Sequence, residues 1–559
     1  MKLLYESSTD AFVFKANIFD KDIPIQAGFE FDVEFSFWYT FNHSYALKLE
    51  KYAKDEKTKA KLREIKNKED DILEKSWSEK SNFMVPKPDN GYEYYPHQLA
   101  GIEYIYERPF TLLGDQMGLG KTSQTIGTFN KMQSESKEKL NWLIICPATM
   151  KDVWAEELKV WLSNYDDYTI SINTGSGFEL ADIMIVNFEA FNATQNKKSS
   201  KYRDPKKGEF NPTFFLFKEL NKVKKINLLA VDESHKLKEW SSNTTKNIFK
   251  LKKKVEKTIF MTGTAIFAKP EEIWTTIRFA NMTHHFMGDK LSFLEYYSDA
   301  RFDFRRRRMV SGEPKNLDEL QRNLRKHFMI RRTSSEGVYR KVRNIIPLDV
   351  EIKNIDKYET LKRKIVDVSY LETGESKRDD SKSIIGALQP TDIVEFSQFR
   401  KECGIAKIKQ AVKFIDDILE TGEKVILFGY HKEVLAYYKE LYPDSAMIVG
   451  STPQKDRIKE IEKFQKDPNC KVFIGNLDSA SVGITLTASS TVIFVEMGVT
   501  PAIMFQAEAR ASRIGQTKIV NVFYLVAKNT LDAYIAETLI RKNKIVEQSL
   551  DKEKLINYD

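Results

Sequence analysis

The 559-residue chain has room for three or four domains, and its 42% hydrophobic and 12% aromatic content excludes wholesale disorder. A formal charge of +8, from 88 basic and 80 acidic residues, permits nucleic-acid binding through local patches without requiring it. The three cysteines form no CxxC pair, the N-terminus is not a signal peptide, and no apolar run reaches the ~18 residues of a membrane span. We therefore expect a reducing compartment, no zinc and no membrane association.

Residues 1–85 are predicted to form a small α+β recognition module. The runs AFVFKA and FWYT alternate as short strands do, and residues 45–77 have helical apolar spacing with dense mixed charge. Trp38 and Tyr39 stand in an aromatic-rich stretch. Their rings either stack on exposed bases or form the core of the module, and the second interpretation is favoured slightly.

Two stretches have the pattern of an α/β sheet. In residues 86–280 the buried runs are FTLLGD, NWLIICP, ADIMIVN, INLLAVDE and KTIFMTG, separated by amphipathic segments. In residues 401–559 the runs are KVILFGY, SAMIVG, CKVFIGN, TVIFVEM and NVFYLV. We predict one parallel-sheet lobe in each stretch, with 281–400 as a helical, basic insertion and linker. The basic runs at Arg305, Arg306, Arg307, Arg308 and at 196–207 are either DNA-backbone contacts or solvated faces.

The sequence GDQMGLGKT (114–122) lies between a predicted strand and an amphipathic helix. A glycine-rich loop in that place exposes backbone N–H groups to nucleotide phosphates. Lys121 is expected to reach the β- and γ-phosphates of ATP and Thr122 to hold Mg²⁺. The general pattern has glycine where this chain has Asp115. The expected nucleotide contacts in the loop are Gly118, Leu119, Gly120, Lys121 and Thr122.

A pair of acids follows the next buried run, in LLAVDESH (228–235). Asp232 is predicted to complete the Mg²⁺ shell and Glu233 to deprotonate the attacking water. The alternative is an acidic pair that caps a helix. In IFMTGTA, the hydroxyls of Thr262 and Thr264, on either side of Gly263, are candidates for sensing the phosphate end, although TGT alone is ordinary turn chemistry.

The sequence QAEARASRIGQ (506–516) places Arg510 and Arg513 three residues apart, on one face of a helix. Two guanidinium groups on one face can reach across a cleft to the γ-phosphate, where charge develops during phosphoryl transfer. Without the phosphate loop, two surface arginines on a polar helix would be the simpler interpretation.

The motifs YPHQ (95–98), GDQMGLGKT, DESH, MTGT and QAEARASRIGQ occur in an order that resembles the Swi/Snf-type superfamily-two DNA translocases. FGYHK, GSTPQKDR and SVGITL are most similar to the annealing-helicase (HARP-like) branch. The resemblance implies α/β architecture with two RecA-like lobes, a helical insertion and a small α+β N-terminal module. It also implies that an aspartate at position 115 is normal. Ser512 and Ala509 depart from the family wording, which puts rate and regulation in doubt rather than ATP hydrolysis.

The same resemblance implies residue roles. Gln98 would read the adenine edge, Gly483 and Gln506 would join the ATP site, and Arg510 and Arg513 would act as fingers. The residues implied to couple the ATP site to DNA are His235, Thr262, Gly263 and Thr264. Those implied to face DNA are Pro147, Trp154, Asn187, Ser451 and Thr452, and plain packing is an equal alternative for Trp154.

The expected function is an ATP- and Mg²⁺-dependent motor on double-stranded DNA that remodels or reanneals strands at forks and junctions. The alternatives are a remodeller of protein–DNA complexes, and a non-catalytic nucleic-acid-binding scaffold. Binding to DNA should be sequence-independent, and a single-strand-binding or replication protein is a possible partner. We expect a cytoplasmic location in a bacterial cell or phage-infected host, or a nuclear one in a eukaryote.

Overall fold

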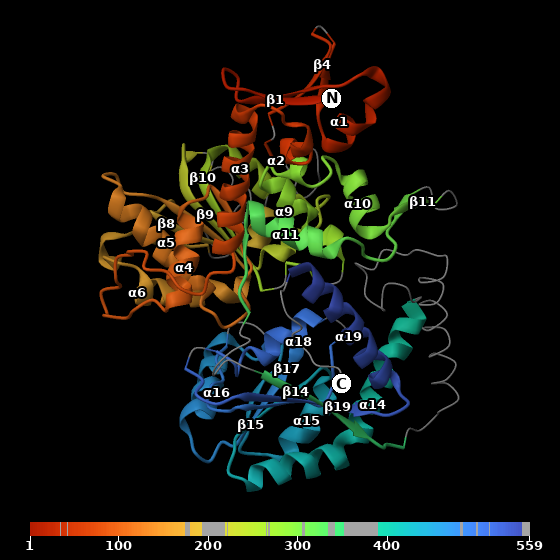
Figure 1. Ribbon diagram of the computed structural model, residues 1–559. Helices are drawn as coiled ribbons and strands as arrows, with labels where there is room; N and C mark the ends of the chain where they lie inside the picture. Colours follow the sequence, from red (N-terminus) through yellow and green to blue (C-terminus); the bar gives the residue numbers. More distant parts are fainter. Residues whose placement is uncertain are drawn as a thin grey trace, which may run out of the picture.

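The computed structural model describes residues 1–33, 35–41, 43–173, 179–192, 219–220, 222–263, 265–266, 269–303, 308–333, 341–351, 390–480, 484–498, 501–513 and 515–550. The N-terminal module, the first lobe and the second lobe follow one another from top to bottom in Figure 1. Both lobes are built on parallel sheets, and the module is built on an antiparallel sheet. The predicted fold class is therefore confirmed.

The N-terminal module has a four-stranded sheet in the order β1-β2-β4-β3. The strands are β1 (Lys2–Glu6), β2 (Ala11–Lys15), β3 (Glu30–Asp32) and β4 (Phe37–Thr40), and the helices are α1 (Asp22–Ala27), α2 (His43–Leu47) and α3 (Glu56–Lys75). Asp55 caps α3 by accepting a hydrogen bond of 2.8 Å from the Thr58 amide. Leu62 of α3 is buried with Leu3, Phe12 and Phe14 of the sheet, so a single core joins the helix to one sheet face.

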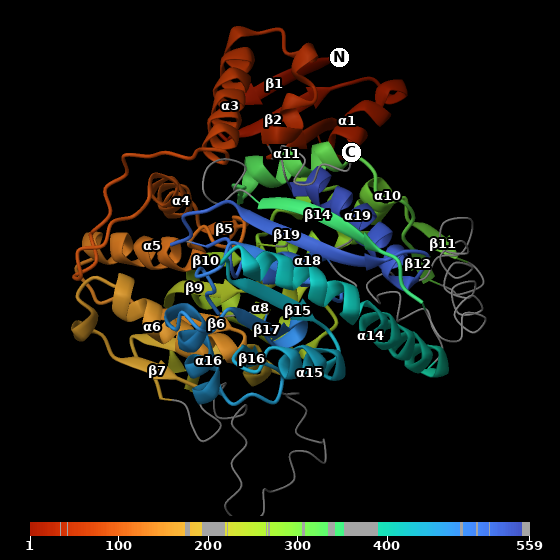
Figure 2. The same cartoon turned by 90° about the horizontal axis from the view of Figure 1, so that it is seen from below.

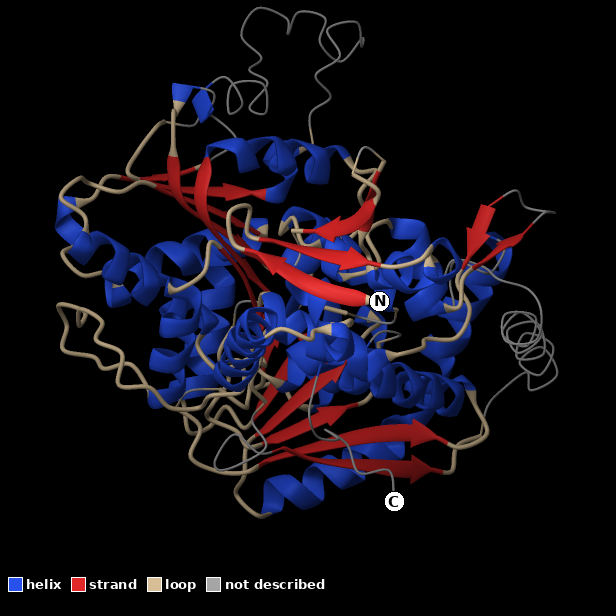
Figure 3. Cartoon of the chain, turned by 45° about the horizontal axis from the view of Figure 1, so that its top comes forward, coloured by secondary structure: helices blue, strands red, loops and turns tan. Residues whose placement is uncertain are grey.

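The first lobe has a seven-stranded sheet in the order β13-β5-β10-β9-β6-β8-β7. The five predicted strands are β5 (Phe110–Leu113), β6 (Trp142–Cys146), β8 (Ile183–Asn187), β9 (Ile226–Asp232) and β10 (Val255–Met261). The helices of this lobe include α4 (Pro96–Tyr106), α5 (Lys121–Glu135), α6 (Lys151–Trp161) and α8 (Asn243–Leu251). Figure 3 shows helices (blue) packed against the sheets (red) of the chain. The short edge strands β7 (Ile170–Ile172) and β13 (Met329–Ile330) were not predicted.

The stretch 281–400, which we expected to form a helical, basic insertion and an inter-lobe linker, contributes helices to the first lobe and a strand to the second. It is preceded by α9 (Trp274–Phe279), and it contains α10 (Lys290–Ser298), the hairpin β11 (Arg301–Asp303) and β12 (Arg308–Val310), and α11 (Leu317–His327). Phe293 of α10 and Leu324 of α11 are buried in the same core as the strands of the first lobe. Beyond them, β14 (Lys341–Leu348) pairs in parallel with β19 (Val520–Ala527) of the second lobe, as Figure 2 shows.

The second lobe has a six-stranded sheet in the order β14-β19-β18-β15-β17-β16. The other strands are β15 (Val425–Gly429), β16 (Ala446–Ile448), β17 (Val472–Asn476) and β18 (Thr491–Phe494). The helices are α14 (Pro390–Glu420), α15 (Lys432–Leu441), α16 (Gln454–Lys466), α17 (Leu477–Ala480), α18 (Pro501–Glu508) and α19 (Leu531–Leu550). All five predicted strands are confirmed; β14 was missed because the segment read as linker.

The last helix, α19, connects the two lobes. Ile535, near its start, belongs to the core of the second lobe, whereas Leu550, its last residue, is buried in the core of the first lobe. Along the way α19 packs against α11. No helix among the described residues is long and apolar enough to cross a membrane, and no group of His, Cys, Asp or Glu side chains among them is arranged to hold a metal ion by itself.

Candidate functional site

The loop between β5 and α5 has the backbone shape of a phosphate-binding loop. Gly118 and Gly120 adopt φ values of +92° and +74°, which side chains other than glycine rarely adopt. A Cβ atom at Gly120 would come within 2.2 Å of Gln98 Nε2, and one at Gly118 within 2.5 Å of the Ser512 carbonyl oxygen in the second lobe. Both positions therefore need glycine, and Gly118 lies where the two lobes touch.

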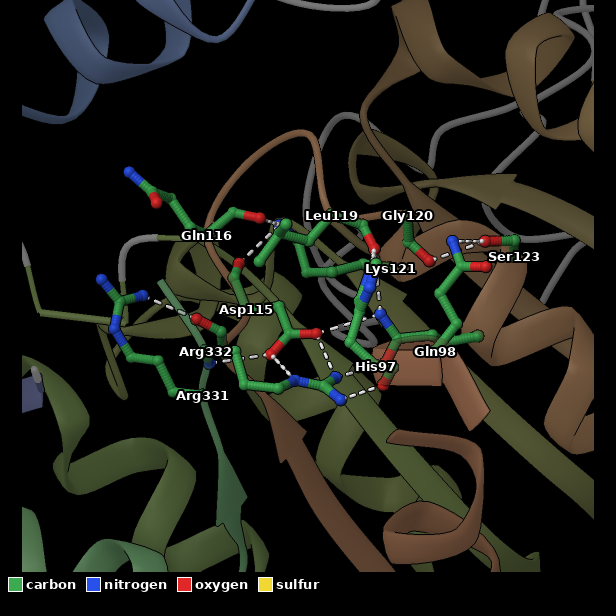
Figure 4. Close-up of polar contacts among 12 residues, drawn as sticks. His97, Gln98, Asp115, Gln116, Leu119, Gly120, Lys121, Ser123, Arg331 and Arg332 are labelled. Carbon is green, nitrogen blue, oxygen red and sulfur yellow. Dashed lines mark hydrogen bonds and ion pairs between the residues drawn. The ribbon is translucent and has the colours of Figure 1, made fainter. Parts of the chain in front are cut away.

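Lys121 begins α5 and its side chain turns back into the loop, as Figure 4 shows. Its Nζ donates hydrogen bonds to the carbonyl oxygens of Asp115, at 2.8 Å, and Gln116, at 3.4 Å. Burial lowers the pKa of Lys121, and the charges of Glu233, Asp115 and Asp232 oppose that shift. The ammonium group thus sits inside the loop, near the acidic pair. Thr122 follows it on the first turn of α5 and is partly exposed.

Asp115 and Arg332 form a buried ion pair that stabilises the phosphate loop. The Asp115 carboxylate also accepts a hydrogen bond of 2.9 Å from Arg332 Nε and one of 3.0 Å from Gln124 Nε2. Burial by itself would raise the pKa of Asp115, but Arg332 and Gln124 bring the net shift downward. Asp115 is therefore an ionised structural anchor, which accounts for its place in the loop.

Arg331, the neighbour of Arg332, also binds the loop. Its Nη1 donates to the carbonyl oxygens of Gly114, at 2.6 Å, and Gly263, at 2.8 Å. Arg331 and Arg332 resemble the arginine pair that follows the first lobe in the Swi/Snf-type family, but that resemblance identifies no contact for them, and Gln124 carried no signal. The pair follows the buried strand β13, and its target in the phosphate loop lies more than 200 residues away along the chain, so only the fold reveals it.

Gln98 lies against the loop at the start of α4 and is fully buried. Its Oε1 accepts a hydrogen bond of 2.9 Å from the Tyr95 amide, and its Nε2 donates one of 3.0 Å to Ser123 Oγ. Next to it, His97 Nε2 donates to the Leu119 carbonyl at 3.0 Å. Gln98 is thus placed beside Gly120 and Ser123 as predicted for the ATP site; its contact with adenine stays a prediction.

Asp232 ends β9 and Glu233 follows it with a φ of +52°, in the left-handed region. Asp232 Oδ2 accepts a hydrogen bond of 3.1 Å from Trp154 Nε1, and Oδ1 accepts one of 2.9 Å from the Glu233 amide. Burial, and then the charge of Glu233, raise the pKa of Asp232 to about 6. A non-glycine residue held at positive φ costs of order 1–3 kcal/mol, and such strain is concentrated at functional sites.

Burial would raise the pKa of Glu233, but His235 brings it below its ordinary value. His235 Nδ1 lies 3.1 Å from Glu233 Oε2 and 3.0 Å from Thr262 Oγ1. Glu233 Oε2 is buried and has no hydrogen bond of good geometry within the described part of the chain. His235 therefore connects Glu233 to the end of β10, where Thr262 and Gly263 lie; Thr264 is outside the described residues.

Arg510 of the second lobe lies close enough to the acidic pair for their charges to interact. Burial and the charge of Arg513 lower the pKa of Arg510 to about 9, while Glu233 and Asp232 oppose the shift from across the lobe boundary. Arg510 Nε donates to the Gln506 carbonyl at 2.8 Å, and Arg513 Nη1 donates to Thr485 Oγ1 at 2.9 Å. Gln506, four residues before Arg510, is buried. Gly483, expected in the same site, lies outside the described residues.

The residues expected to face DNA differ in their solvent exposure, and some of them lie outside the described residues. Trp154 is fully buried, packs edge-on against Trp142 and bonds Asp232, so its side chain has no surface for DNA and the packing interpretation holds. Pro147 is also buried, whereas Asn187 is partly buried and bonds Glu189 Oε2 at 2.7 Å. Ser451 is exposed, and Thr452 Oγ1 accepts from the Val449 amide at 3.0 Å. Outside the described residues lie Arg305, Arg306, Arg307 and the run 196–207; Arg308 is in β12, with an undescribed side chain.

Comparison with known proteins agrees with this geometry. The model of the SNF2-related domain matches residues 97–398, and that of the helicase conserved C-terminal domain matches residues 406–515. The mouse protein "DNA annealing helicase and endonuclease ZRANB3" is 30% identical over 482 residues, which cover 82% of this chain and 41% of that protein. The Xenopus tropicalis "SWI/SNF-related matrix-associated actin-dependent regulator of chromatin subfamily A-like protein 1" is 27% identical over 473 residues, covering 81% and 44%.

A solved structure, "Sulfolobus solfataricus SWI2/SNF2 ATPase core in complex with dsDNA", aligns with 20% identity and a TM-score of 0.36, covering 85% of this chain and 96% of that one. At that score the likeness supports no statement about how the lobes are placed. The family assignment depends on the domain models, the first of which spans more than half of the chain. The chain belongs to the SNF2-related family, and its second lobe is a helicase conserved C-terminal domain.

Proposed function

We propose that this chain is a DNA-dependent ATPase that translocates on double-stranded DNA and remodels or reanneals strands at forks and junctions. The observation that supports this most is the close approach of Gly118 of the phosphate loop to the Ser512 backbone, which lies between Arg510 and Arg513 of the second lobe. The charges of Asp232 and Glu233 also act on Arg510 from across the lobe boundary, in agreement with this contact. A composite site of this kind makes catalysis depend on lobe closure, as a motor requires.

The residues present fit ATP with Mg²⁺. Asp232 offers a buried carboxylate at a strand end, and Thr122 offers a hydroxyl at the N-terminus of α5, both of which are oxygen ligands that Mg²⁺ prefers. Bound Mg²⁺ would offset the negative charge of the β- and γ-phosphates. Because two acids lie side by side in a buried site, the raised pKa of Asp232 indicates a place where added positive charge is favourable.

The protein groups have separate roles in this proposal. The loop amides and Lys121 would bind and orient the phosphates. Glu233 would take a proton from the attacking water, since its Oε2 is left without a well-formed hydrogen bond. Arg510 and Arg513 would stabilise the charge that develops as the γ-phosphoryl group is transferred to water and ADP leaves. His235 and Thr262 would couple the ATP site to the ends of β9 and β10.

The N-terminal module presents an aromatic row that suits unpaired bases. Phe35, Phe37, Tyr39 and Phe41 stand two residues apart, with ring centroids 6.0, 6.5 and 5.7 Å apart in succession. Phe35 and Phe41 are each about two-thirds exposed. Aromatic side chains on a sheet face bind single strands without sequence preference by stacking. Trp38 does not belong to this row, because it alternates to the opposite face and packs on Phe31 at 4.9 Å.

Reannealing of strands is proposed because the name of the mouse relative describes that protein as a DNA annealing helicase. This chain spans only 41% and 44% of the length of the two relatives described above, so their whole activities are not transferred with the family. The substrate and the outcome of translocation are therefore proposals that the following experiment tests.

The experiment measures ATP hydrolysis with no nucleic acid, duplex DNA, single-stranded DNA, forked DNA and RNA, with Glu233→Gln as the inactive control. Stimulation by DNA that is highest with forks and lost in Glu233→Gln supports the proposal. Equal stimulation by plain duplex moves the substrate toward protein–DNA complexes. No DNA-dependent hydrolysis contradicts the motor and favours the scaffold. Phe35→Ala/Phe41→Ala should lower the fork preference while leaving duplex-stimulated hydrolysis unchanged; an unchanged fork preference contradicts the role of the row.

A further inference from the structure

Arg325, in α11, is a fully buried cation of the first lobe and lies outside every motif of the ATP site. Its side chain has no solvent exposure, and its Cζ is 3.1 Å from the centroid of the Trp77 ring. The guanidinium group donates hydrogen bonds to three backbone carbonyl oxygens, each at 3.0 Å. A planar, forked donor can satisfy three acceptors in different directions, which a lysine ammonium on a single stem does less well.

The three carbonyls belong to three different parts of the chain. Ser76 directly follows α3, the long helix of the N-terminal module. Arg331 directly follows β13, at the edge of the first-lobe sheet. Leu550 ends α19, which begins in the second lobe. Arg325 therefore stands where the module and both lobes meet (Figures 1 and 2 show α3, α11 and α19 together).

The helix α19 is anchored at both ends. At its start, Asp532 forms a buried ion pair with Lys407 of α14, and Ile535 packs in the second-lobe core. At its end, Leu550 is buried in the first-lobe core. A helix fixed at both ends transmits displacement along its axis. Any rotation of the second lobe relative to the first must therefore act on the hydrogen bond between Arg325 and the Leu550 carbonyl.

The carbonyl of Arg331 leads from this junction to the ATP site. The backbone of Arg331 accepts from Arg325, while its side chain donates to the carbonyls of Gly114 and Gly263. Gly114 starts the phosphate loop, and Gly263 follows the end of β10, next to Thr262. Only one residue thus separates Arg325 from the two backbone segments that shape the phosphate-binding site.

We propose that Arg325 is a positioning residue that makes the phosphate loop sensitive to the docking of the N-terminal module and of α19. This inference rests on the proposed function, because it assigns to the junction control over the same ATP site. When Ser76 and Leu550 are docked, Arg325 holds the Arg331 backbone so that its guanidinium supports Gly114 and Gly263. When either is undocked, Arg325 is free to shift and the loop loses that support.

The first test uses the full chain with Arg325→Lys and Arg325→Met. The matched control is Lys257→Met, because Lys257 is also a buried first-lobe cation bound to three backbone carbonyls, those of Ile105, Tyr106 and Arg108, at the far end of β10. Hydrogen exchange of the amides of residues 114–120 should be at least fivefold faster in both Arg325 variants and unchanged in Lys257→Met. Affinity for a fluorescent ATP analogue should fall at least fivefold in both Arg325 variants and stay unchanged in Lys257→Met.

Those two readouts need no hydrolysis, so they stay informative if the wild-type chain proves not to hydrolyse ATP. Where hydrolysis is present, the DNA-stimulated kcat should fall at least tenfold in Arg325→Lys. Wild-type loop exchange and nucleotide affinity in a folded Arg325→Lys protein would overturn the inference. So would equal effects in Lys257→Met, because the change would then reflect stability alone.

The second test perturbs docking of the module without touching Arg325, so it remains available if the Arg325 variants do not fold. Lys326, the next residue of α11, pairs with Glu69 of α3 at 2.9 Å. Lys326→Glu should speed exchange in the phosphate loop, and the swapped pair Lys326→Glu/Glu69→Lys should restore it. A loop that responds to neither variant, or a swap that rescues nothing, would contradict the coupling.

Discussion

Replacing Trp154 by phenylalanine removes one N–H donor from Asp232 while keeping most of the buried aromatic ring. The hydrogen bond of 3.1 Å from Trp154 Nε1 lowers the pKa of Asp232, against burial and Glu233, which raise it. A hydrogen bond to a charged group contributes roughly 1.5–3 kcal/mol, and one pKa unit corresponds to about 1.4 kcal/mol. Because the Glu233 amide and Lys121 still stabilise the carboxylate, we expect a rise of about one unit, from about 6 toward 7.

The assay measures the Mg²⁺ concentration for half-maximal ATP hydrolysis between pH 5.5 and 8.5. An Asp232 with a higher pKa is protonated over more of this range, and a protonated carboxyl is a poor Mg²⁺ ligand. Trp154→Phe should therefore need several-fold more Mg²⁺ near pH 6 and nearly the wild-type concentration at pH 8.5. Affinity for DNA should not change. A variant whose Mg²⁺ requirement is the same as wild type at every pH, or one that binds DNA more weakly, would refute this reasoning.

Two further changes test the second lobe and the lobe boundary. Glu508→Gln leaves Arg343 and Lys341 buried without their carboxylate, so it should destabilise the second lobe by about 3–5 kcal/mol at pH 7. Since the pairing lowers the pKa of Glu508 from 4.5 to about 2, that stabilisation is present above pH 4.5 and is lost as the pH falls toward 2. Urea unfolding should therefore show a smaller difference in stability between wild type and variant at pH 3.5 than at pH 7. A difference that stays constant would contradict this prediction. Gly118→Ala should lower the kcat of DNA-stimulated hydrolysis far more than Gly91→Ala. Both glycines have positive φ, but only Gly118 lies against Ser512. Similar losses in the two variants would show that backbone strain alone matters.

The long buried strands could be predicted because their apolar runs lie between helical patterns. Every predicted strand of both lobes is present, and the acidic pair lies at the carboxyl end of β9 as expected for a parallel sheet. What could not be predicted depends on pairing between distant segments. Most residues of β14 are only partly buried, without a clear alternation, and β14 lies next to a charged stretch, so only its eight paired residues on β19 identify it as a strand of the second lobe.

The residues of the candidate site could be predicted where they lie close together in the sequence and form a recognisable motif. Lys121, Asp232, Glu233 and Arg510 occur in motifs whose spacing already places them at strand and helix ends, and the fold brings them together. Trp154 was not predictable in the same way, because the sequence does not show that a tryptophan on α6 reaches the end of β9. The contacts of Arg331 and Arg332 with the phosphate loop could not be predicted for the same physical reason: their partners are distant in sequence.

The composite site is the central claim, and Arg510→Gln tests it most directly when ATP-analogue affinity and DNA-stimulated hydrolysis are measured on one preparation. In the proposed site, Arg510 would contribute from the second lobe, while the phosphate loop and Lys121 would bind nucleotide from the first. We predict that the variant loses at least ~100-fold in kcat, a lower bound set below the ~10³–10⁵ attributed to arginine fingers, and keeps its affinity for the analogue within about threefold. Hydrolysis that persists at the wild-type rate would contradict a site completed by the second lobe.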